Sequence, residues 1–344
     1  MSRLMRCGFM SWAILCSFVA VRADDAEDQA VEVVKKLRGS VTRDEKLPGK
    51  NVIRVYLSRT QVTDAEVKEL AALKNLNTLH LGDTRVTDAG VKELGALKNL
   101  TELNLNRTKV TDAGVKELAG LQSLTLLYLD DTQVTDAGLK ELAKLKNLTK
   151  LLLNKTYRSK PRERDFRQTG RNDPRNPNSL QPGHAQVTDA GLKELAELKN
   201  LTSLQLGGTQ VSDAGLKELA GLKNLSTLHL NDTQVTDAGV KELVALRNLT
   251  SLSLSKTYQP TTHVTDVGVK ELTALKNLNS LQLNGTQVSV DSQRVMRGGY
   301  YDWRASICGA AYRHGQPPVF RNASIGFRSA LSVEAVKAAP GNPE

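Results

Sequence analysis

The chain has 344 residues, of which 40% are hydrophobic and only 4% aromatic, and its formal net charge is +10. The basic excess is confined to two segments: residues 157–186 carry seven basic and three acidic groups, and residues 288–344 carry seven and four. The rest of the chain after residue 23 sums to zero, which excludes a continuous basic groove for nucleic acid.

Residues 1–23 are typical of a secretory signal peptide. Arg3 and Arg6 give a positive start, residues 9–21 form an apolar run, and Ala23 precedes an acidic stretch. This run is shorter than the roughly 20 residues that a membrane span needs. We therefore expect cleavage after about Ala23 and export to the periplasm, the envelope or the medium, without a stable membrane span. An uncleaved anchor is the alternative.

Cleavage would also remove two of the three cysteines. Cys7 and Cys16 lie within the signal, so Cys308 would be alone in the mature chain. An internal disulfide and a multi-cysteine metal site are then both excluded.

Residues 24–61 are predicted to form an N-terminal cap. The apolar spacing from Ala26 to Leu37 indicates a helix, and the segment from Val52 to Leu57 indicates a first strand.

From Val62 onward, a unit of about 24 residues is repeated eight times between residues 62 and 287. Each copy contains a TDAG-like tetrapeptide followed by the pattern L-x-x-L-x-L-x-x-T. The copies begin at Val62, Val86, Val110, Val134, Val187, Val211, Val235 and Val264.

This repeat resembles the leucine-rich repeat family, in particular its subtypes with a TDAGL-type helix. The resemblance implies an α/β solenoid, with a curved parallel sheet on the concave side and helices on the convex side. One copy cannot bury its leucines alone, so the core forms by stacking of neighbouring copies. With strands ~4.8 Å apart, eight of them would extend over roughly 35–40 Å.

The first copy shows the local signals of the unit. Leu79 and Leu81 alternate as in a strand with one buried face. Thr63 and Glu66 fit a capping box, and Asp64 suits the first turn of the helix, so we attribute the recurring aspartate of TDAG to helix capping. Asn75 follows the helix, where a residue often adopts the left-handed conformation.

Two insertions interrupt the repeats after the same strand position, at residues 157–186 and 258–263. Both are therefore expected to leave the same rim of the solenoid. The longer one contains four of the ten prolines, and we expect it to be largely disordered by itself.

Two columns of side chains on the predicted sheet could matter for function. The first alternates in charge and suggests a structural ladder of ion pairs; it consists of Arg59, Asp83, Arg107, Asp131 and Lys155. The second lies between the paired leucines and begins with large anchors of the kind that protein interfaces use. Its first half, our predicted partner-binding site, is Tyr56, His80, Asn104, Tyr128 and Leu152.

The tail, residues 288–344, has a different pattern. It contains Arg297-Gly298-Gly299, Ala310-Ala311-Tyr312-Arg313 and Ile325-Gly326-Phe327-Arg328. These motifs resemble the C-terminal end of the formylglycine-generating, sulfatase-modifying factor family. That family oxidises a substrate cysteine with a pair of cysteines shortly after the Gly-Gly. Here that segment has no cysteine and Cys308 stands alone, so we expect a truncated, inactive fragment that covers the last repeat.

We therefore expect an exported, monomeric protein-binding module without catalytic residues, metal or other cofactor. A degenerate formylglycine-generating enzyme and a purely structural envelope protein are the alternatives. Some repeats of this subtype serve as ubiquitin-ligase adaptors, but such an adaptor would have to be located in the cytosol, and the signal peptide argues against that.

Overall fold

The structure is a computed structural model that describes residues 26–45, 51–155, 187–255 and 264–288. The predictions about the signal peptide, the two insertions and the tail beyond Val288 fall outside these residues. The chain divides into two compact units, residues 1–186 and residues 187–344.

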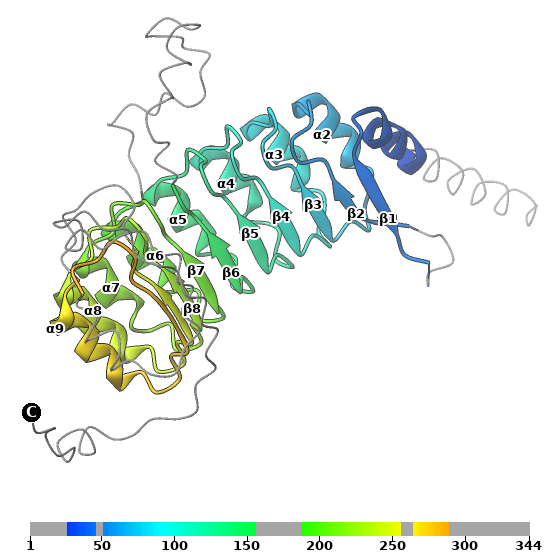
Figure 1. Cartoon of the computed structure of the whole chain (residues 1–344). Helices are drawn as coiled ribbons and strands as arrows, with labels where there is room; N and C mark the ends of the chain where they lie inside the picture. Colours follow the sequence, from blue (N-terminus) through cyan, green and yellow to red (C-terminus); the bar gives the residue numbers. More distant parts are fainter. Residues whose placement is uncertain (1–25, 46–50, 156–186, 256–263, 289–344) are drawn as a thin grey trace, which may run out of the picture. The chain divides into compact units, whose positions relative to one another are not determined.

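The first unit contains a short antiparallel pair of strands followed by parallel strands that alternate with helices (Figure 1). Its sheet has the order β1-β2-β3-β4-β5-β6, which is also the order along the chain. The elements are β1 (Ser40–Arg43), β2 (Val52–Tyr56), α2 (Asp64–Leu70), β3 (Thr78–His80), α3 (Asp88–Leu94), β4 (Glu102–Asn104), α4 (Asp112–Leu118), β5 (Leu126–Tyr128), α5 (Asp136–Leu142) and β6 (Lys150–Leu152).

The N-terminal cap contains the predicted helix, over residues 26–36, and the predicted strand β2. Between them lies β1, which the sequence did not predict and which pairs antiparallel with β2. Glu27 connects these elements, because its carboxylate accepts hydrogen bonds from the Val52 N–H (2.9 Å) and from Arg43 (2.9 Å).

The second unit repeats the strand–helix alternation with the sheet order β7-β8-β9-β10, all parallel. Its elements are α6 (Asp189–Leu195), β7 (Ser203–Gln205), α7 (Asp213–Leu219), β8 (Thr227–His229), α8 (Asp237–Glu242), η2 (Leu243–Ala245), β9 (Ser251–Ser253), α9 (Asp266–Glu271), η3 (Leu272–Ala274) and β10 (Ser280–Gln282).

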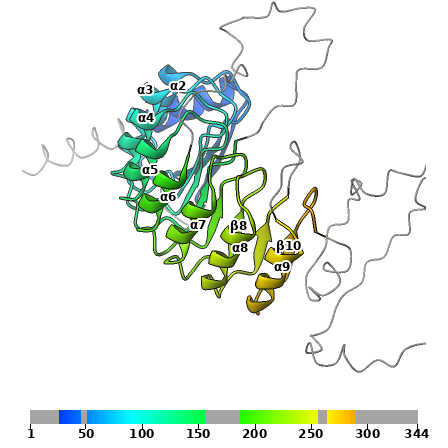
Figure 2. The same cartoon turned by 90° about the vertical axis from the view of Figure 1, so that its left-hand side faces the viewer.

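The core of each unit lies between the sheet and the helices. Leu79 and Leu81 are fully buried while His80 between them faces the other way, as the alternation predicted. The parallel register sets equivalent leucines side by side, Leu79 opposite Leu103 and Leu103 opposite Leu127. In both units the helices cover one face of the sheet (Figures 1 and 2). We call the opposite face the open sheet face.

The recurring aspartate of TDAG links neighbouring repeats. In the first pair, the Thr87 N–H donates to Asp64 Oδ1 (2.8 Å) and the Thr87 hydroxyl donates to Asp64 Oδ2 (2.6 Å). Thr87 is the N-cap of α3, so the aspartate of one helix secures the start of the next. The same two bonds join Asp88 to Thr111 and Asp112 to Thr135. Helix capping alone was therefore an incomplete explanation of these aspartates.

This link also explains the glycine of TDAG. A Cβ at Gly114 would lie 2.4 Å from Asp88 Oδ1, so only glycine leaves room for the carboxylate. The first copy has no preceding aspartate, and Glu66 stands where the later copies have glycine. The Glu66 carboxylate accepts the same two donors, the N–H (2.8 Å) and the hydroxyl (2.6 Å) of Thr63. The Thr63 hydroxyl also lowers the pKa of Glu66. The predicted capping box is thus the terminal form of the link.

The left-handed residue of the repeat lies after the strand, which makes our assignment to Asn75 wrong. Positive φ occurs at Arg59, Asp83, Arg107, Asp131 and Asp232 (55–62°), and at Gly208 and Gly285 (70°). This is the turn that leads into the closing threonine, whose hydroxyl, as at Thr84, donates to the carbonyl of Leu81 (2.6 Å). Glycine and aspartate recur there because they tolerate this conformation best.

Candidate functional site

The predicted partner-binding residues lie in one row across five neighbouring strands of the first unit. The parallel register sets Tyr56 opposite His80, His80 opposite Asn104, Asn104 opposite Tyr128 and Tyr128 opposite Leu152. Each side chain projects from the open sheet face because it alternates with a buried leucine. We call these five residues the central row.

In the central row, the His80 ring contacts the rings of both Tyr56 and Tyr128. The ring centroids of Tyr56 and His80 are 4.9 Å apart and nearly perpendicular, at 86°. Those of His80 and Tyr128 are 6.2 Å apart at 67°, although their strands are not neighbours. Asn104 lies between those strands, and its Oδ1 accepts a hydrogen bond from the Asn106 N–H (3.0 Å), so its side chain leans towards the backbone. The rings therefore meet across it and form an aromatic cluster.

A carboxylate adjoins this cluster. His80 Nε2 lies 2.9 Å from Glu102 Oε1, and both side chains are about one quarter exposed, at 23% and 28%. Tyr56 is the most accessible ring, with 36% of its surface exposed. Burial and the charges of Glu102 and Asp130 raise the pKa of the Tyr128 hydroxyl. The aromatic cluster thus combines apolar rings with a negative potential.

Asp130 lies two residues after Tyr128, at a position where the neighbouring copies have Asn106 and Asn154. Asn106 Oδ1 accepts from the Asp130 N–H (2.7 Å), and Asp130 Oδ1 accepts from the Asn154 N–H (2.8 Å). Burial raises the pKa of the Asp130 carboxyl, and the Asn154 N–H partly offsets this effect. This column therefore joins successive repeats, as the Asp–Thr links do on the helix side.

The column of alternating charge forms ion pairs at two of its steps. Arg59 Nε lies 3.9 Å from Asp83 Oδ2, and Arg107 Nε lies 3.4 Å from Asp131 Oδ2. The Lys155 amine instead contacts the carbonyl oxygen of Thr132. Burial lowers the pKa of Lys155, while Asp131 acts in the opposite direction. These contacts support the ladder that the sequence predicted, although its members are also the residues of the left-handed turn.

The open sheet face of the second unit has a different chemistry. The equivalent positions on its strands are Gln205, His229, Ser253 and Gln282. The Ser253 hydroxyl donates to Gln282 Oε1 (2.9 Å), and burial lowers the pKa of His229. The flanking strand positions are serine or threonine, at Ser203, Thr227, Ser251 and Ser280. The described strands of the second unit offer neutral hydrogen-bonding groups on this face and no aromatic pair.

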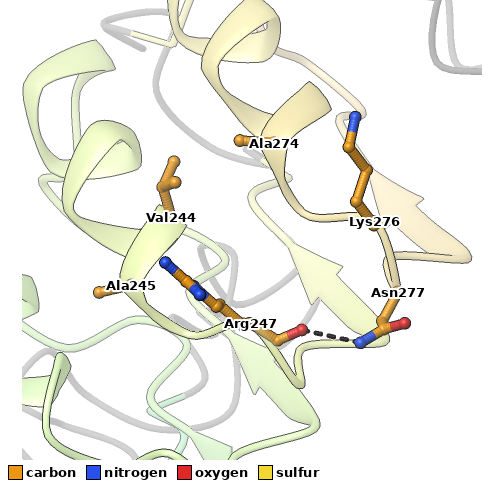
Figure 3. A pocket seen from close by; sticks show the side chains of 6 residues that line it. All are labelled: Val244, Ala245, Arg247, Ala274, Lys276 and Asn277. Carbon is orange, nitrogen blue, oxygen red and sulfur yellow. Dashed lines mark hydrogen bonds between the residues drawn. The ribbon is translucent and has the colours of Figure 1, made fainter.

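A hollow of about 570 Å³ lies on the helix side of the second unit, between η2 and η3 (Figure 3). Its lining is Val244, Ala245, Arg247, Ala274, Lys276 and Asn277. The Asn277 amide donates to the Arg247 carbonyl (2.9 Å), a bond that the equivalent asparagines of other copies also make. The two helices here end in 3₁₀ turns. Val244 and Thr273 stand in these turns where the other copies have alanine or glycine, and β-branched residues of this kind disfavour the α-helix. The hollow brings together two cations and no catalytic pair.

Neither a metal centre nor a membrane span is found in the described parts of the chain. No group of three or more histidine, cysteine, aspartate or glutamate side chains there is placed to hold a metal ion. None of the helices in those parts is both long and apolar enough to cross a bilayer.

The sequence reasoning missed Glu102, the carboxylate of the site. It lies two residues before Asn104, so the same strand alternation that selected the central row places it on the same face. Reading that flanking column across the copies would have found Arg54, Thr78, Glu102, Leu126 and Lys150.

Comparison with known proteins agrees with the repeat. A family model described as leucine rich repeat matches residues 74–134, and a second one matches residues 197–220 and 221–244. A search of curated proteins finds no match.

Several solved structures are similar. Internalin C2 of Listeria monocytogenes is 29% identical, with 68% of this chain and 81% of that chain covered and a TM-score of 0.48. An internalin, InlF, from the same organism is 20% identical, with coverages of 76% and 90% and a TM-score of 0.27. A plant peptide hormone receptor, RGFR1 in complex with RGF2, is 18% identical, with coverages of 72% and 37% and a TM-score of 0.41. The matched segments and the eight strand–helix repeats of the described chain are leucine-rich repeats.

Proposed function

We propose that the protein is an exported binding module that recognises a protein partner through the central row of the first unit. The observation that carries this proposal is the aromatic cluster of Tyr56, His80 and Tyr128 on the open sheet face. Aromatic side chains on a rigid sheet present a large contact area at little entropic cost, and tyrosine is enriched among the residues that dominate interface energies. Leucine-rich repeats would expose this face as the concave side of the solenoid.

We expect the two units to contribute different kinds of contact to partner binding. Its open sheet face bears neutral serine, threonine and glutamine side chains and lacks a ring pair in its described strands. Such a surface can extend a contact through hydrogen bonds, whereas the aromatic cluster supplies the apolar anchors. We therefore place the main energetic contribution in the first unit.

The proposal is tested by affinity capture from an envelope or secreted fraction, followed by mass spectrometry and affinity measurement with the identified partner. Tyr128→Ala should weaken binding by about 1–2 kcal/mol, a roughly fivefold to thirtyfold rise in Kd. The substitution should cost little stability, because Tyr128 projects away from the leucine core. Gln282→Ala, at the equivalent strand position on β10 of the second unit, is the matched control and should leave Kd nearly unchanged.

Equal Kd values for wild type and Tyr128→Ala would contradict the placement of the site. A loss of binding on Gln282→Ala alone would move it to the second unit.

Export is part of the proposal and has its own test. N-terminal sequencing of the protein from the envelope or medium should begin near Asp24, since the signal pattern ends at Ala23. Protein that retains Met1 and stays in the cytosol would contradict export.

We propose no enzymatic activity. Formylglycine-generating chemistry would be the exception, and it would require Cys308, which lies outside the described residues. Aldehyde formation on a cysteine-containing sulfatase peptide, lost in Cys308→Ser, would overturn this part of the proposal.

A further inference from the structure

Glu102 and Tyr128 lie on the open sheet face on either side of the contacts made by His80. The carboxylate of Glu102 is held near the rings by His80, whose Nε2 lies 2.9 Å from it. The Tyr128 ring meets His80 at a centroid distance of 6.2 Å on the same face. A partly exposed carboxylate therefore lies beside His80, whose ring contacts both tyrosines.

The local charge favours a cation. Glu102 and Asp130 both act on Tyr128 as negative charges. Aromatic faces add to this potential, because the ring quadrupole attracts cations placed over it. An acidic ligand would be repelled here, and a purely apolar ligand would cover the Glu102 carboxylate without offering it a further hydrogen-bond donor.

Two cations of the described strands share the column of Glu102, and neither is on a strand next to it. Arg54 on β2 and Lys150 on β6 are the basic residues in the column of Glu102, and both are exposed. Each lies two strands from Glu102, about 10 Å along the sheet at the usual strand spacing. Exposed charges at such a separation interact weakly at physiological ionic strength.

We propose that this point binds an arginine side chain of the partner protein, an inference that rests on the proposed function and specifies its chemistry. The planar guanidinium can stack on the Tyr128 ring and at the same time donate two hydrogen bonds to a carboxylate such as Glu102. A lysine ammonium offers no such plane. Arginine is also among the residues enriched at the centres of interfaces.

The experiment uses the full mature protein with ¹³C-labelled tyrosine rings and N-acetyl-arginine amide as the probe. Tyr128→Phe assigns the resonance of Tyr128. Titration should shift that resonance with saturation in the range of roughly 10 mM, as a single contact point implies. N-acetyl-citrulline amide, which has the same shape without the charge, should cause no saturable shift.

The decisive variant is Glu102→Gln, which keeps the size of the side chain and an oxygen next to His80. It should weaken arginine-amide binding at least about fivefold, because one charge-assisted pair is lost. Glu117→Gln removes the same charge from the exposed side of α4 and should change the titration little.

Equal shifts with the citrulline probe, or equal affinity in Glu102→Gln and wild type, would overturn the inference. So would the absence of any shift of Tyr128 up to about 50 mM. In each of these cases, the proposed function would stand if the affinity for the partner still fell in Tyr128→Ala. The reverse result, arginine-amide binding with a partner insensitive to Tyr128→Ala, would contradict the function alone.

Discussion

Removing one Asp–Thr link should lower the stability of the first unit measurably. In Asp88→Ala, the Thr111 N–H and hydroxyl lose the acceptors that now lie 2.8 and 2.6 Å away. Hydrogen bonds to a charged group contribute ~1.5–3 kcal/mol each, and both bonds here are only partly buried. We take the lower limit for each and expect the free energy of unfolding to fall by about 3 kcal/mol, a large part of the 5–15 kcal/mol typical of a domain.

Thermal unfolding followed by circular dichroism measures this change, and the melting temperature should fall by about 6–12 °C. Asp88→Asn keeps one acceptor oxygen but loses the charge, so its effect should be smaller than that of Asp88→Ala. Glu117→Ala, an exposed substitution on α4, is the control and should change stability by less than about 0.5 kcal/mol. An Asp88→Ala protein as stable as this control would refute the link as a source of stability.

The glycine of the next repeat provides a second, independent check. Gly114→Ala would place a Cβ 2.4 Å from Asp88 Oδ1, so it should destabilise the wild-type protein by about 1–3 kcal/mol. In the Asp88→Ala background this clash is gone, and alanine is a better helix former than glycine by about 1 kcal/mol. The two substitutions should therefore couple by at least about 1 kcal/mol in a double-mutant cycle. Additive effects would show that the carboxylate does not occupy the space the glycine leaves.

Three further outcomes follow from the same contacts. Glu66→Gly gives the first repeat the glycine of the later repeats, but no preceding aspartate is there to accept the two Thr63 bonds. The free energy of unfolding in urea should therefore fall by about 2 kcal/mol, and by less than half of this in Glu66→Gln. Asp130→Asn should stabilise the protein by up to about 1 kcal/mol at neutral pH, because burial disfavours the charged carboxylate and raises the pKa of Asp130. The cost of burying this charge is absent below the unfolded carboxyl pKa of about 3.9, and it grows as the pH rises through the folded pKa. An equal gain at pH 3 and pH 7 would contradict this. Truncation after Gln287 should lower the melting temperature if the tail covers the last repeat. Leu283 in that repeat is half-buried, whereas its counterpart Leu254 in the preceding repeat is 2% exposed. An unchanged melting temperature would indicate that the tail is an idle remnant.

The repeat and its core were predictable because they depend on local periodicity. Leucines two residues apart define a strand face, and the eight copies specify their own stacking, so β3 to β10 and α2 to α9 follow from the sequence. The strand β1 did not, because its sequence SVTR has no apolar pattern and forms only by pairing with β2.

The links between repeats were hidden for a different reason. Asp64 and Thr87 are 23 residues apart, and neither residue alone shows that it has a partner. The contrast between Glu66 in the first copy and glycine in the later ones was a visible signal, but its meaning depends on a steric contact with the previous repeat. In the same way, the central row was predictable from alternation, whereas the contact of His80 with Tyr128 depends on the side chain of Asn104, which lies between them and leans towards the backbone.

The placement of the partner-binding site is tested most directly by site-specific photocrosslinking. A benzoylphenylalanine at position 128 lies in the central row of the open sheet face, and one at position 117 lies on the exposed side of α4. Irradiation of the captured complex should give a covalent adduct of partner and protein from position 128 and little from position 117. Crosslinking from position 117 alone, or equally from both, would contradict the central row as the binding surface.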